Sequence, residues 1–88
     1  MIVKIDKSLE KDLSKISDKT TLKKLHSTII KLQNAKDLSE ISNLKKLKGS
    51  QSYFRIRIGD YRLGIVHENN EIEIIRLLHR KDIYRYFP

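Results

Sequence analysis

The first half of the chain carries apolar residues at helical spacing. Residues 1–5 predict a short strand, and Ser8 is expected to cap the helix that follows. The polar residues 17–21 end this helix, and either Asp18 or Thr20 caps a second one, so that the two helices form an antiparallel hairpin. Both apolar faces are expected to cover a sheet. They consist of Leu9, Leu13 and Ile16 in the first helix and Leu22, Leu25, Ile29 and Leu32 in the second.

Residues 36–50 follow neither pattern, because their apolar residues recur every three positions. This spacing fits neither a long helix nor a strand. We interpret the segment as a connection with one helical turn, closed by Gly49 and Ser50.

The second half changes to the alternation of half-buried strands, predicted at residues 53–58, 61–67 and 71–78. Gly59-Asp60 is a two-residue turn that supports a tight hairpin, and residues 81–86 predict a last helical turn. The order β-α-α-β-β-β predicts one α+β domain over residues 1–88. In it, a small antiparallel-rich sheet carries a two-helix hairpin on one face and is followed by a short C-terminal helical turn.

The Gly59-Asp60 turn fixes which residues face each other in the first hairpin. Ile58 pairs with Tyr61, Arg57 with Arg62, Ile56 with Leu63 and Arg55 with Gly64. One face then belongs to the core, through Phe54, Ile56, Ile58, Leu63 and Ile65, and the other holds Tyr53, Arg55, Arg57 and Arg62. Like charges directly opposite each other destabilise a sheet by a few tenths to about 1 kcal/mol. Gly64 is expected to leave an open spot beside Arg55.

The turn between the last two predicted strands determines which further residues lie on the same face as the arginines. If Asn69-Asn70 forms it, Arg62 lies opposite Leu77, so His79 joins the arginines and Arg80 follows at the strand's end. Tyr84 and Tyr86 can then fold back toward the same patch. Arg76 falls at an inward position, which either a bulge or an acidic partner would explain.

Composition predicts that the protein is attracted to a polyanion, since the net charge is +8 and the isoelectric point is near 9.8. All arginines lie between residues 55 and 85, and arginine grips phosphate through a planar fork of donors. Cationic forks interleaved with tyrosine rings suit a flexed single-stranded RNA. A solvated outer face of the sheet is the competing interpretation.

Composition also excludes several classes of protein. Without cysteine there are no disulfides or thiolate metal sites, and the scattered histidines predict neither a metal nor another cofactor. No apolar run has the length of a membrane span, and the N-terminus lacks the apolar core of a secretory signal. We therefore expect a cytoplasmic protein without a membrane partner.

The stretches "LKKLKGS", "YFRIRIGDYRLGI" and "HRKDIYRYF", in this order of elements, resemble the RelE/ParE toxin superfamily of toxin–antitoxin systems. RelE-like members cut mRNA on the ribosome, whereas ParE-like members poison DNA gyrase without a nuclease site. The resemblance implies a RelE-like endoribonuclease with a cognate antitoxin, the ribosome and mRNA as partners, and a toxin–antitoxin hetero-oligomer. A ParE-like gyrase poison and a catalytically weakened member that only binds its antitoxin are the alternatives.

The resemblance also implies roles for residues. Arg57, Arg62 and Arg80 would stabilise the charge that builds up on the scissile phosphate, with Tyr86 at the expected C-terminal tyrosine position. His79 is nominated as general base or acid, because arginine does not deprotonate in proteins. The residues assigned to RNA binding are Arg55, Tyr84, Arg85 and Lys48.

Overall fold

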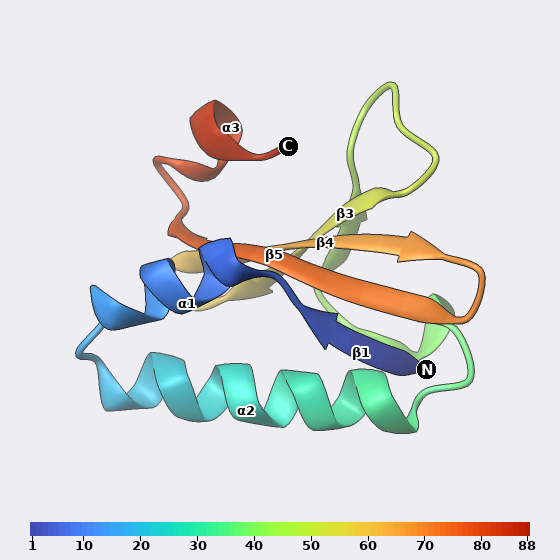
Figure 1. The fold of residues 1–88 in the computed structure, drawn as a ribbon, viewed down its shortest axis with the longest axis horizontal. Coiled ribbons are helices and arrows are strands. Elements are labelled where there is room, and N and C mark those ends of the chain that lie inside the picture. The colour runs from blue at the N-terminus through green and yellow to red at the C-terminus, as the bar shows by residue number, and fades with distance from the viewer.

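The computed structural model describes residues 1–88, which form one five-stranded mixed sheet with helices on both faces (Figure 1). The strands lie in the order β1-β5-β4-β3-β2, and only the β1–β5 pair is parallel. The α+β class and the predicted order of elements are confirmed. In chain order the elements are β1 (Ile2–Ile5), α1 (Lys7–Ser14), α2 (Lys19–Asn34), the 3-10 helix η1 (Leu38–Glu40), β2 (Leu44–Lys46), β3 (Tyr53–Ile58), β4 (Tyr61–Glu68), β5 (Glu71–His79) and α3 (Ile83–Tyr86).

The core lies between the sheet and the α1–α2 hairpin, whereas α3 lies on the opposite face (Figure 1). Each of the larger elements contributes side chains that are almost fully removed from water. The buried cluster consists of Leu9, Leu25, Leu32, Leu38, Ile56, Ile58, Leu63, Ile65, Ile72, Ile74 and Leu77. None of the helices combines the length and the apolar character that a membrane-crossing segment requires.

Both long helices begin at an aspartate. The prediction that Ser8 caps α1 is wrong, because the cap is Asp6, whose carboxylate accepts the Ser8 backbone N–H at 3.0 Å. In α2 the cap is Asp18, one of the two predicted residues. Its carboxylate accepts the Thr20 N–H at 3.0 Å and the Thr21 hydroxyl at 2.8 Å.

The segment from 36 to 50 contains the predicted helical turn, η1, and a strand that the sequence did not predict. Strand β2 pairs with β3 at the edge of the sheet, with Lys45 opposite Arg55. Three residues are too few to show a period of two, and so the strand left no signal in the hydrophobic pattern.

The pairing of β3 with β4 is the predicted one, including Arg57 opposite Arg62 and Arg55 opposite Gly64. The predicted pairing of Arg62 with Leu77 is wrong, because Arg62 lies opposite Leu78. The register shifts between Gly64 and Ile65, where Ile75 is the extra residue of β5.

This bulge moves every later residue of β5 to the other face of the sheet. Leu77 enters the core, and His79 lies opposite Tyr61, on the face that α1 and α2 cover. The expectation that His79 extends the arginine side is therefore wrong. Arg76 leaves the inward position and pairs with Asp12 of α1, so both explanations offered for Arg76 apply.

Candidate functional site

Three arginines share the face of the sheet opposite the α1–α2 hairpin. Arg55 and Arg57 alternate along β3, and Arg62 of β4 lies directly opposite Arg57; these three residues form the arginine face. None of them has a carboxylate within 4.0 Å, since the only ion pairs of the molecule are Lys4–Glu71 and Arg76–Asp12. The arginine face therefore carries uncompensated positive charge that an anion would neutralise.

The Arg62 side chain is held by the turn that precedes it. One of its terminal nitrogens, Nη1, donates to the carbonyl oxygens of Gly59 and Tyr61, each at 2.9 Å. These bonds restrain the guanidinium beside the β3–β4 turn. A restrained cation loses less conformational freedom when an anion binds to it.

Helix α3 brings an aromatic ring to the arginine face. The Arg55 guanidinium lies 4.4 Å from the centre of the Tyr84 ring, which is a cation–π contact. Because Tyr84 is 72% exposed, much of its ring remains available for stacking. Tyr84 folds back as the sequence predicted.

The anchor of α3 is Phe87, which packs on the spot that Gly64 leaves in the sheet. A Cβ atom at Gly64 would lie 2.7 Å from the Phe87 ring, and the ring also meets Tyr53 edge-on at 5.7 Å between centroids. The expected open spot beside Arg55 is therefore filled, and Gly64 serves the docking of α3.

A groove of about 370 Å³ runs over the arginine face; we call it the small groove. Besides the three arginines and Tyr84, β2 and the residue before it contribute to its lining. These additional residues are Asn43, Leu44 and Lys45. Sequence reasoning missed Lys45 and Asn43 because it missed β2, which places Lys45 opposite Arg55.

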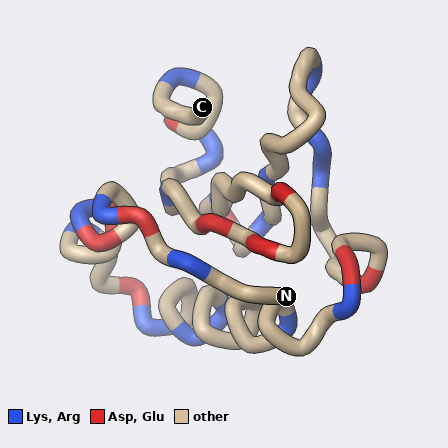
Figure 2. Tube along the Cα trace, turned by 45° about the vertical axis from the view of Figure 1, so that its right-hand side comes forward, with Lys and Arg blue, Asp and Glu red and all other residues tan.

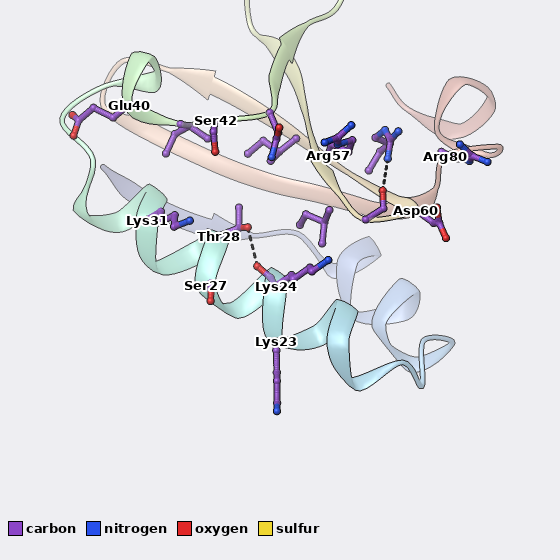
Figure 3. A pocket seen from close by; sticks show the side chains of 16 residues that line it. Lys23, Lys24, Ser27, Thr28, Lys31, Glu40, Ser42, Arg57, Asp60 and Arg80 are labelled. Atoms are coloured by element: carbon purple, nitrogen blue, oxygen red, sulfur yellow. Dashed lines mark hydrogen bonds between the residues drawn. The ribbon is translucent and has the colours of Figure 1, made fainter.

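A second, larger groove of about 880 Å³ lies between α2 and the β3–β4 hairpin (Figure 3). It shares Arg57 and Arg62 with the small groove and adds Arg80, whose backbone N–H donates to the Asp60 carbonyl at 2.8 Å. Helix α2 adds three lysines to this lining. They are Lys23, Lys24 and Lys31.

His79 and Tyr86 lie elsewhere, in a third groove with the Asp12–Arg76 pair. The His79 ring meets Tyr61 edge-on at 5.7 Å, and its Nδ1 accepts the Lys81 N–H at 3.2 Å. Of the other residues assigned to RNA, Arg85 and Lys48 are exposed and line none of the three grooves.

The distribution of charge separates the two ends of the β-sheet. Figure 2 shows acidic positions gathered near the β4–β5 turn, where Glu68, Glu71 and Glu73 lie. The arginines converge toward the other end, at the β3–β4 turn.

No group of three or more His, Cys, Asp or Glu side chains is placed to hold a metal ion. Chemically, the site can bind a phosphate chain and stabilise negative charge that develops on it.

Comparisons with known proteins match this architecture. A family model described as the ParE toxin of the type II toxin–antitoxin system parDE matches residues 3–84. Toxin RelE3 of Methanocaldococcus jannaschii is 39% identical over 89 residues, with 100% of each chain covered.

Solved structures give the same relationship. The RelB–RelE antitoxin–toxin complex of Methanococcus jannaschii matches with a TM-score of 0.82 and 38% identity, over 97% of this chain and 99% of the other. The RelE–RelB complex of Pyrococcus horikoshii matches at 0.73 and 25%, over 90% and 93%. The YoeB dimer of Staphylococcus aureus, with a TM-score of 0.73, 21% identity and coverage of 91% and 97%, shares the fold.

Proposed function

Because this chain belongs to the ParE toxin family and is a toxin of a type II toxin–antitoxin system, we propose that it is a RelE-like, ribosome-dependent mRNA endoribonuclease. The observation that carries the proposal is the arginine face, which gathers three cations without a carboxylate partner and places the Tyr84 ring beside them. Phosphate contacts and base stacking are the two interactions that hold single-stranded RNA.

In the proposed reaction the 2′-oxygen of a ribose attacks the adjacent phosphorus. The new P–O2′ bond replaces the P–O5′ bond, which leaves a 2′,3′-cyclic phosphate and a free 5′-hydroxyl. Charge builds on the non-bridging oxygens during this step, and Arg57 and Arg62 lie where they can receive it together, with Arg55 and Arg80 at either side. Preorganised donors of this kind contribute on the order of 10²–10³ in rate each.

Proton transfer needs a different group, since arginine cannot serve as a base. His79 lies on the opposite face of the sheet and lines the third groove, which Tyr86 lines as well. We assign His79 a positioning role, through the Lys81 N–H that its Nδ1 accepts at the start of the connection to α3. The 2′-proton passes to water, the departing 5′-oxygen takes up a proton from water to become the 5′-hydroxyl, and Tyr84 is the ring that stacks on the target nucleotide.

The proposed partners follow from the same surface. Relatives have been solved as RelB–RelE complexes, and we propose a cognate antitoxin whose acidic segment covers the arginine face and neutralises it. The toxin and antitoxin would form a hetero-oligomer with no membrane component, in the cytoplasm where ribosomes are found.

The second candidate is a ParE-like gyrase poison, which the description of the matching family model favours. Expression of the chain in growing cells, followed by mapping of mRNA ends and of DNA breaks, separates the two. We expect new mRNA ends at translated codons, which Arg57→Ala and Arg62→Ala abolish and His79→Ala reduces less. Gyrase-linked DNA breaks without new mRNA ends would support the poison instead.

A further inference from the structure

The larger groove has a lining unlike that of the small groove. Six cationic residues line it, and they come from α2, from strands β3 and β4 and from the turn after β5. The only acidic side chains in its lining are Glu40 and Asp60, and the Glu40 carboxylate already accepts the Lys36 N–H at 2.6 Å. The cations are Lys23, Lys24, Lys31, Arg57, Arg62 and Arg80.

None of these cations forms an ion pair, and all but Lys23, whose side chain Figure 3 shows directed away from the groove, are available to an anion there. Lys24 and Lys31 are seven residues apart on one face of α2, and Figure 3 shows both on the side that looks toward the strands. The Lys24 ammonium approaches the β3–β4 turn, where it would lie 3.8 Å from a Cβ atom at Gly59. Lys24 therefore lies beside the β3–β4 turn on its α2 side, whereas Arg57 and Arg62 line the same groove from the arginine face.

The lining also restricts the class of ligand. It contains no aromatic ring, so it offers no platform on which unpaired bases could stack. Its only apolar residues are Ile41, Ile56 and Ile58, and the last two are 2% and 3% exposed. A protein segment would find almost no apolar anchor there. The lining therefore offers mainly cationic side chains and hydroxyl groups, which suit the sugar–phosphate backbone of a nucleic acid.

We propose that the larger groove is a separate binding site for the sugar–phosphate backbone of base-paired RNA. A duplex keeps its bases stacked inside and presents phosphates and 2′-hydroxyls to a protein, and so it requires no aromatic platform. Arg57 and Arg62 line both grooves, so the duplex would run beside the single strand bound on the arginine face, a placement that rests on the proposed function. The toxin thus binds two RNA elements, one through bases and backbone and one through backbone alone.

The test measures binding, so that it can fail independently of the proposed cleavage. The full-length chain is titrated with a 2′-O-methyl RNA hairpin, which lacks the attacking hydroxyl, and with an unstructured 2′-O-methyl strand of the same length, at several salt concentrations. The variant is the double substitution Lys24→Gln/Lys31→Gln. The matched control is Lys7→Gln/Lys11→Gln, which removes the same charge from exposed positions of α1 that line none of the three grooves.

We expect the α2 variant to bind the hairpin roughly tenfold more weakly and to lower the slope of log K against log salt by about 2, one for each lost phosphate contact. The unstructured strand and the control should change much less. An unchanged hairpin affinity and slope would overturn the proposal, and so would an equal loss for both RNAs. Competition by polyglutamate as strong as that by the hairpin at equal charge would also overturn it, in favour of an acidic protein segment.

Discussion

At the scale of single residues, the positive charge of the arginine face favours anion binding, and the same charge destabilises the sheet of the free protein. Arg57 and Arg62 lie opposite each other across two strands, and no carboxylate lies within 4.0 Å of either. Such like-charged pairs destabilise a sheet. If the arginine face binds phosphate or an acidic antitoxin, as we propose, the bound anion relieves this repulsion.

Replacing one member of this pair should therefore stabilise the free protein. We expect Arg57→Thr to raise the free energy of unfolding by a few tenths to about 1 kcal/mol, because the repulsion disappears and threonine suits a strand. Urea unfolding of the isolated chain at low salt measures the change. High salt should shrink the difference, and a variant less stable than the parent at both salt concentrations would show that the two arginines do not repel each other.

Asp12 is a second residue whose environment predicts a large effect. Its buried carboxylate accepts Nε and Nη2 of Arg76 at 2.8 and 2.9 Å and the Leu77 N–H at 2.9 Å. The first of these contacts raises the pKa of Arg76 above its ordinary value. Through these bonds α1 covers the open edge of β5 directly after the bulge.

Removing this carboxylate should leave a guanidinium and a backbone donor without partners. We expect Asp12→Ala to lower the free energy of unfolding by about 3 kcal/mol, as measured in urea. Glu10→Ala on the same helix, at an exposed position without a partner, should change it by less than about 0.5 kcal/mol. A loss at Asp12 no larger than at Glu10 would show that the pair does not hold α1 in place.

At the scale of elements, strong local signals predicted the fold, and two short irregularities escaped them. The β3–β4 register followed from the turn at Gly59-Asp60, and the predicted apolar residues of both helices, apart from Leu22, pack in or against the core. The bulge at Ile75 could not be predicted, because a single extra residue in a run of apolar side chains leaves no trace in the alternation. This extra residue places His79 on the face of the sheet away from the arginines. Because β2 was not predicted, Lys45 was not recognised as a residue that lines the small groove.

The docking of α3 depends on a glycine in β4. We expect Gly64→Ala to push the Phe87 ring away, since the new Cβ atom would lie 2.7 Å from it, and thereby to lower both stability and RNA binding through Tyr84. Phe87→Ala serves as the partner in a double-mutant cycle. In its background, Gly64→Ala should cost much less stability. Equal costs in both backgrounds would contradict the proposed contact.

The cap of α2 predicts a pH dependence. Hydrogen bonds from the Thr21 hydroxyl and the Thr20 N–H hold the pKa of Asp18 below its ordinary value of 3.8. The unfolded chain therefore binds more protons in this range, and stability falls as the pH drops from about 4 through the lower, folded pKa. We expect Asp18→Asn to flatten this fall in acid unfolding curves. Asp60→Asn, whose carboxylate caps no helix, should leave the fall unchanged.

At the scale of the whole molecule, charge is arranged along the strands. The acidic β4–β5 turn and the arginine-rich β3–β4 turn lie at opposite ends of the eight-residue strand β4, roughly 25 Å apart at the usual rise per residue. Such a separation orients the protein toward a polyanion before contact. Both grooves proposed to bind RNA open at the basic end, and so the molecule would approach the ribosome with its arginine face forward.

The most direct test of the proposed ribonuclease is the chemistry of the RNA ends that the purified toxin produces on translating ribosomes. We predict cuts within the translated codon that leave a 2′,3′-cyclic phosphate and a 5′-hydroxyl. Arg57→Ala and Arg62→Ala should each reduce the rate on the order of 10²-fold, while Lys7→Gln/Lys11→Gln should leave the cutting intact. Intact mRNA with the unmodified toxin, or full activity without either arginine, would contradict the claim that the arginine face is a ribonuclease site.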